Sequence, residues 1–82
     1  MRGKVIAVNL RKGLFAVLID DGGCSVVEIV DTCEVELGDL MVGQLDTLGR
    51  ETLRNETRTE DVDVCIQDIH RSSADAQTQV HR

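Results

Sequence analysis

Aromatic residues are nearly absent from this chain of 82 residues, which has no Trp, no Tyr and a single Phe, Phe15. Apolar residues still make up 41% of the chain and charged residues 29%, a composition typical of a globular protein. A chain of this length forms one small domain and buries only about 60% of its unfolded surface. We therefore expect one modest, aliphatic core.

Long apolar runs are absent as well. The longest, Leu14–Ile19, has six residues, whereas a membrane-spanning helix needs roughly 18 or more. The run Val5–Val8 is too short for the apolar segment of a signal peptide. An odd number of cysteines cannot all pair within one chain, so we expect free thiols at Cys24, Cys33 and Cys65. These features predict a cytoplasmic protein that does not enter a membrane.

Basic residues are fewer than acidic ones and are unevenly spread along the chain. Fifteen acidic residues against nine Lys and Arg give a net charge of −6, which disfavours non-specific binding to nucleic acid or anionic lipid. No basic residue lies between Lys12 and Arg50, whereas residues 1–19 carry four basic residues and no acid. Either these residues form an ordinary solvated surface, or they form a small basic patch on an acidic body.

The sequence also lacks a recognisable catalytic, metal or cofactor motif. Cys24, Cys33, Cys65 and His70 could supply zinc ligands, but no pair has the close spacing typical of zinc sites. The carboxylate pairs Glu34/Glu36 and Asp61/Asp63 fit the alternation of exposed residues along a strand better than an acid–base pair. We therefore predict no cofactor, no metal and no enzymatic activity.

The first part of the chain predicts three strands, Lys4–Asn9, Leu14–Ile19 and Ser25–Val30. The segment Asn9–Gly13 suits a tight connection with a residue at positive φ, and Asp20–Gly23 has the Asp-Gly signal of a hairpin turn. Leu14–Ile19 is apolar at every position and so on both faces of the strand, which indicates a strand covered on both sides.

The rest of the chain is less regular. Residues 39–45 and 61–67 predict a fourth and a fifth strand, and residues 46–60 are expected to form a mobile connection with one helical turn around 50–53. Residues 71–82 contain one large aliphatic residue and are expected to be a disordered tail. The prediction is a single all-β domain over residues 1–70, a five-stranded antiparallel barrel of the OB type, with an SH3-like barrel as the alternative.

The opening of the chain resembles that of cold-shock domains. The resemblance covers about the first 30 residues and rests on the pattern Gly3-x-Val5, Asn9-x-x-Lys12-Gly13 and Asp20-Asp21-Gly22. It implies a five-stranded OB barrel in which aromatic and His side chains on strands one to three contact unpaired bases, mostly by stacking. The corresponding positions here are all aliphatic: Ala7, Val8, Leu14, Ala16, Val27, Ile29 and Val30. Phe15 falls between two of them and is expected to point into the barrel.

Because base stacking contributes about 1–3 kcal/mol per base, these replacements remove most of the binding energy of a single-strand binder. We therefore expect a non-catalytic protein-interaction or structural module whose partner is a protein or a second copy of the chain. Weak single-stranded nucleic-acid binding of the cold-shock type is the alternative. The candidate interaction surface consists of Lys4, Val8, Arg11, Lys12, Leu14 and Ala16. We expect its aliphatic part to be covered, either by Leu48 or Leu53 of the 46–60 connection or by a second copy.

Overall fold

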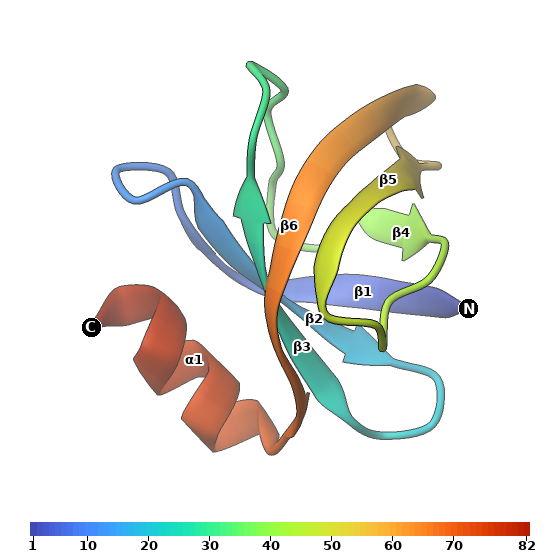
Figure 1. The fold of residues 1–82 in the computed structure, drawn as a ribbon. Helices are drawn as coiled ribbons and strands as arrows, with labels where there is room; N and C mark the ends of the chain where they lie inside the picture. The colour runs from blue at the N-terminus through green and yellow to red at the C-terminus, as the bar shows by residue number, and fades with distance from the viewer.

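Six antiparallel strands close into a barrel in the computed structural model, which describes residues 1–82, and one helix packs against the outside (Figure 1). The strands are β1 (Arg2–Asn9), β2 (Leu14–Ile19), β3 (Cys24–Ile29), β4 (Leu40–Val42), β5 (Gly49–Asn55) and β6 (Glu60–Arg71), and the helix is α1 (Ser73–His81). The order around the barrel is β1-β2-β3-β6-β5-β4, with β4 returning to β1. The predicted all-β antiparallel barrel is confirmed and is compatible with an OB-like fold, but it has six strands rather than five.

The first three strands form as the sequence predicts. The turn after β2 has Gly22 at φ +93°, and the Gly22 N–H donates to the Ile19 carbonyl at 2.9 Å. Gly13, at φ +66°, ends the turn between β1 and β2. Gly3 is required for another reason, since a Cβ on it would lie 2.3 Å from a methyl carbon of Val17. These positions fix the β1-β2-β3 sheet.

Twelve buried residues fill the barrel interior. Phe15 lies among them with no exposed surface, as predicted, and is paired in register with Val8 of β1 and Val27 of β3. The buried Asp39 carboxylate closes the end of the barrel near β4, because it accepts hydrogen bonds from the Asn55 side chain at 2.9 Å and the Glu36 N–H at 3.0 Å. The barrel interior is thus the predicted aliphatic core with one aromatic residue, and a second, smaller cluster of six buried residues lies outside it.

The expectation of a mobile connection over residues 46–60 is wrong. Most of this segment is β5 and its hairpin with β6, and there is no helical turn around residues 50–53. In β5 only Leu53 and Asn55 are buried, while Arg50, Thr52 and Arg54 face solvent. The strand is therefore stabilised by its pairing with β6 and has little apolar alternation of its own.

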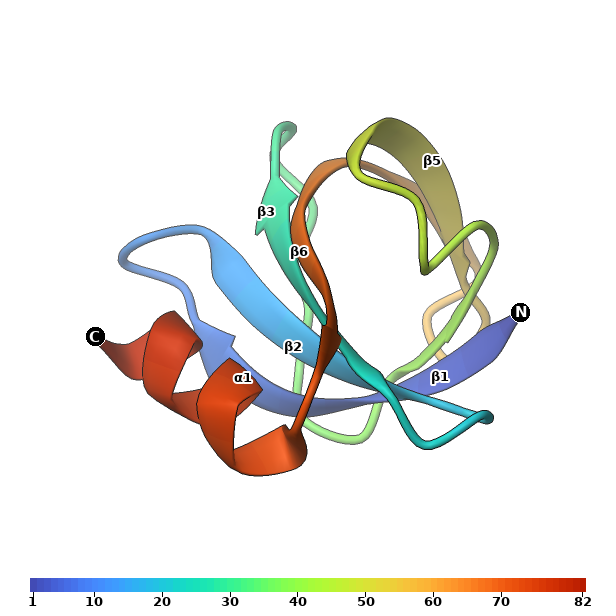
Figure 2. The same cartoon turned by 60° about the horizontal axis from the view of Figure 1, so that its bottom comes forward.

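The expectation of a disordered tail is also corrected. Residues 73–81 form α1, and the Ser72 side chain caps it by accepting from the Asp75 N–H at 3.1 Å. Ala76 and Val80, four residues apart on one helix face, are fully buried against the sheet. Figure 2 shows α1 lying along one side of the barrel, next to β1 and β2. A helix with so few apolar residues forms because the sheet provides the surface it packs on.

Candidate functional site

The six residues of the predicted interaction surface are separated by the fold. Ala16 is buried beneath α1, and Leu14 packs against the same apolar cluster. Val8 packs instead against the barrel core, because a bulge between Val5 and Ala7 changes the alternation along β1. The prediction that Val8 belongs to the outer interaction surface is therefore wrong. Lys4 lies toward one end of β1, and Arg11 and Lys12 lie in the turn at the other end.

The outer face of β1, β2 and β3 is covered by α1. A cluster of six buried residues joins the two layers: Ala7, Ala16, Cys24, Val26, Ala76 and Val80. The expectation that the aliphatic face is covered holds, but the segment that covers it was predicted wrongly. Leu48 is 58% exposed and Leu53 lies in the barrel interior, so residues 46–60 do not reach this face.

Several positions that match the stacking aromatics of cold-shock domains do not face outward at all. Val27 is fully buried in the barrel core, and Val8 and Ile29 pack against that core. Only Ala7, Leu14 and Ala16 belong to the face beneath α1. A nucleic-acid base could not reach Ala7 or Ala16 unless the helix moved away.

One part of the outer sheet stays open. Lys4 on β1 is paired in register with Leu18 on β2 and with Leu40 on β4, so the three side chains form a row across three strands. Leu18 and Leu40 are 38% and 39% exposed, and Lys4 makes no ion pair. We call these three residues the open row. They line a surface hollow of about 430 Å³ together with Arg2, Gly3, Ile19 and Asp20.

Sequence reasoning found Lys4 of the open row but missed Leu18 and Leu40. Leu18 lies in the run Leu14–Ile19, which was predicted to be covered on both faces, and Leu40 was placed in a longer strand over 39–45. In the structure α1 covers Leu14 and Ala16 but not Leu18, and β4 is only three residues long. Leu18 could have been found from the sequence, because it alternates with Leu14 and Ala16 along β2 and so lies on the same face of the strand.

Arg11 and Lys12 lie beside the end of α1. They line a polar hollow of about 290 Å³ with Asn9, His81 and Arg82. The Asn9 side chain donates to the Val80 carbonyl at 2.9 Å, and the Lys12 ammonium donates to the Arg82 carbonyl. Such donors stabilise the last carbonyls of a helix, which have no partner within it. Asn9 and Lys12 therefore hold the C-terminal end of α1.

The carboxylates on the surface form structural contacts. Arg58 lies within 3.6 Å of both Glu34 and Glu36 and 3.5 Å from Glu60. Asp61 pairs with Arg54 at 3.3 Å, and Asp63 accepts from the Thr52 hydroxyl at 2.8 Å. Each carboxylate of the pairs noted in the sequence thus has a cation or a hydroxyl as its partner.

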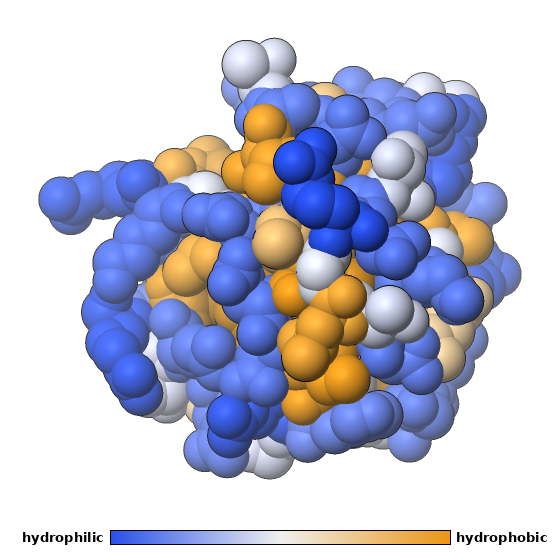
Figure 3. All heavy atoms as spheres, in the orientation of Figure 1, coloured by the Kyte–Doolittle hydropathy of each residue, from blue (hydrophilic) through white to orange (hydrophobic).

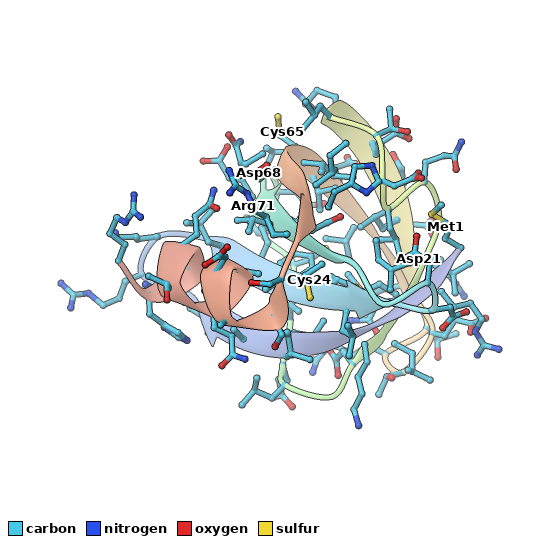
Figure 4. All side chains as sticks on the ribbon, turned by 90° about the horizontal axis from the view of Figure 1, so that it is seen from below. Met1, Asp21, Cys24, Cys65, Asp68 and Arg71 are labelled. Atoms are coloured by element: carbon cyan, nitrogen blue, oxygen red, sulfur yellow. The ribbon has the colours of Figure 1, made fainter.

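The three free cysteines lie in different surroundings. Burial under α1 raises the pKa of the Cys24 thiol. A hydrogen bond to the Asp31 carboxylate, with burial as a second cause, raises the pKa of Cys33 to about 11. Cys65 is half-buried on β6, away from Cys24 (Figure 4). No group of three His, Cys, Asp or Glu residues comes together in a way that could hold a metal ion.

Asp31 and Asp68 are both held in the charged form. The N–H groups of Asp63 and Cys33 donate to Asp31, at 3.0 and 2.9 Å, and lower its pKa. The Arg71 guanidinium donates to Asp68 at 2.7 Å and lowers its pKa, and Figure 4 shows the two side chains next to each other. Both carboxylates accept from backbone N–H groups of β6, Asp31 from Asp63 and Asp68 from Ile69 at 2.9 Å, and so help to fix the backbone of this strand.

The one helix, α1, has nine residues and does not have the length or the apolar composition of a membrane-spanning helix. Comparison of the chain with protein-family models, with curated proteins and with solved structures finds no match.

Proposed function

We propose that the protein is a non-catalytic protein-interaction module of the cytoplasm and that its partner binds at the open row. The observation that carries the proposal is the unpaired ammonium of Lys4 between two half-exposed leucines, Leu18 and Leu40. Apolar side chains that flank a charge favour a partner segment that presents a carboxylate between two apolar groups. The free thiols agree with a reducing compartment.

The residues that line the hollow at the open row support this choice, because three of them are apolar and Arg2, Lys4 and Asp20 are charged. Elsewhere, on the face drawn in Figure 3, most of the surface is hydrophilic and apolar atoms gather mainly in a central band. Arg2, next to Lys4 in sequence, is held by Glu56 at 3.1 Å, so Lys4 is the cation free to meet a partner's carboxylate. An apolar centre with a polar rim is the usual anatomy of a protein interface.

Single-stranded nucleic-acid binding of the cold-shock type is the alternative function. It rests on the turn residues shared with that family and on the cations Arg11 and Lys12. It has less support, because the one aromatic side chain of the sheet, Phe15, is buried in the barrel and α1 covers Ala7 and Ala16. Such binding would be electrostatic and weak.

Capture from native lysate, with and without nuclease, tests the proposed function. The tagged chain is compared with Leu18→Asp and Lys4→Glu, and Leu48→Asp is the matched control because Leu48 is exposed and belongs neither to the open row nor to the lining of its hollow. We expect the chain to capture a partner protein whose amount does not change on nuclease treatment. The captured amount should fall at least tenfold with Leu18→Asp or Lys4→Glu and should stay unchanged with Leu48→Asp. Retention by all variants, or loss on nuclease treatment alone, would refute the proposal. A doubled molecular mass that reverts with Leu18→Asp would identify a second copy as the partner.

A further inference from the structure

The apolar cluster under α1 is separate from the barrel core. Its six residues come from β1, β2, β3 and α1, whereas the twelve residues of the barrel core include none from α1. The barrel interior is therefore complete without the helix. Moving α1 away would expose Ala7, Ala16, Cys24 and Val26 and would leave the core of the barrel intact.

The sheet beneath α1 has the shape and the donors that a helix requires. Its floor is made of small side chains, Ala7 and Ala16, which let a helix backbone approach closely. At one end, Asn9 and Lys12 donate to the carbonyls of Val80 and Arg82. The sheet face beneath α1, which we call the groove, is therefore apolar and has a cationic end that matches the negative end of a helix dipole.

The helix now in this groove is a weakly held occupant. It has nine residues, and isolated helices shorter than about 12–15 residues are marginal in water. Only two of its side chains, Ala76 and Val80, are buried. An element with so few buried contacts is expected to open before the rest of the fold does.

The groove also continues beyond the helix. Leu14, Ala16 and Leu18 share the outer face of β2, and Leu18 remains 38% exposed. Leu18 is paired with Cys24, which is itself paired with Arg71 just before α1 begins. A longer helix, extended at its N-terminal end, would therefore also cover Leu18.

We propose that the groove formed by β1, β2 and β3 is a helix-binding site, that α1 is its resident occupant, and that a partner binds by replacing α1 with a longer helix. The partner helix would carry a small residue and an aliphatic residue four positions apart, as Ala76 and Val80 do, with a further apolar residue one or two turns earlier to cover Leu18. This is the helix-in-groove mode of recognition. The site shares Leu18 with the open row but does not require a partner there.

Cys24 provides the test, because it is fully buried beneath α1. In a Cys33→Ser, Cys65→Ser background it is the single thiol, so its rate of reaction with a disulfide reagent reports opening of the groove. Val80→Asp should raise this rate at least tenfold, and Gln77→Asp, which places the same charge on the exposed face of α1, should change it less than about twofold. Val80→Ala should raise it about tenfold, and far-UV circular dichroism should show the strands intact in every variant.

A synthetic peptide of residues 71–82 then tests binding in trans. At millimolar concentration it should slow the Cys24 reaction of the Val80→Asp chain at least threefold, whereas the same peptide carrying Val80→Asp should have no effect. Millimolar peptide is needed because a short peptide bears the cost of helix formation and lacks the effective concentration of a tether. An unchanged Cys24 rate in Val80→Ala would overturn the proposal. So would failure of the peptide to protect an opened, folded barrel, whatever the outcome of the capture experiment at the open row.

Discussion

Replacing Phe15 by Ala should remove a large part of the stability of the barrel. Phe15 has no exposed surface and lies between Val8 and Val27 in the interior of twelve residues. A buried Phe→Ala change costs about 3–5 kcal/mol, from lost burial and from the cavity left behind. A domain of 82 residues has a total stability of about 4–12 kcal/mol. If the total stability lies at the low end of this range, the variant should be barely folded at room temperature. At the high end it should remain folded but be clearly destabilised.

Urea denaturation followed by far-UV circular dichroism measures this loss, since the chain has no Trp or Tyr for fluorescence. With a slope of about 1 kcal/mol per molar urea, the midpoint should fall by roughly 3 M or more. Phe15→Leu should cost about 1.5 kcal/mol or less, and Leu10→Ala, at a side chain that is 62% exposed, should stay within about 0.5 kcal/mol. A loss below about 1 kcal/mol for Phe15→Ala would refute its position in the core.

Three further predictions concern the reactivity of Cys33, the stability of the fold at low pH and binding to nucleic acid. At pH 8 the Cys33 thiol, whose pKa is about 11, should react slowly with iodoacetamide, and Asp31→Ala should accelerate it several-fold by removing the hydrogen bond that raises this pKa. Because the pKa values of Asp31 and Asp68 are lowered in the folded state, they stabilise the fold above their ordinary value of 3.8, and this contribution is lost as the pH falls through the folded values. The urea midpoint should thus drop between pH 6 and pH 3, and by less in Asp31→Asn; equal drops would contradict this. Titration of dye-labelled short oligonucleotides, followed by fluorescence anisotropy, should give dissociation constants of about 10⁻⁴ M or weaker at physiological salt. Submicromolar, sequence-dependent binding would reverse the order of the two functions.

The first half of the fold could be predicted because its signals are local. The Asp20–Gly23 and Asn9–Gly13 turns each contain a glycine at positive φ, and the runs between them are apolar. β5 could not be found in this way, because its outer residues are polar and only Leu53 and Asn55 are buried. Its pairing with β6 depends on contacts that form only in the folded barrel.

The covered face could be predicted but not its cover. The aliphatic residues of β1 and β2 indicated a surface that needs a partner, whereas α1 buries only Ala76 and Val80 and lacks a broad apolar face. One signal was present, since Ser72 with Asp75 three residues later is a typical start of a helix. The polar composition of the tail still predicted disorder, because two buried apolar side chains stabilise a helix only when a sheet surface that fits them is present.

Closure of the outer face by α1 is the claim on which both proposals depend, because it leaves the open row as the free surface and makes the groove a site that can be emptied. Methyl nuclear Overhauser spectroscopy on isotope-labelled protein tests it most directly. Cross-peaks should join the Val80 methyl groups to methyl groups of the sheet residues in the same cluster, Ala7, Ala16 and Val26. Random-coil chemical shifts over residues 73–81, with no such cross-peaks, would contradict the account.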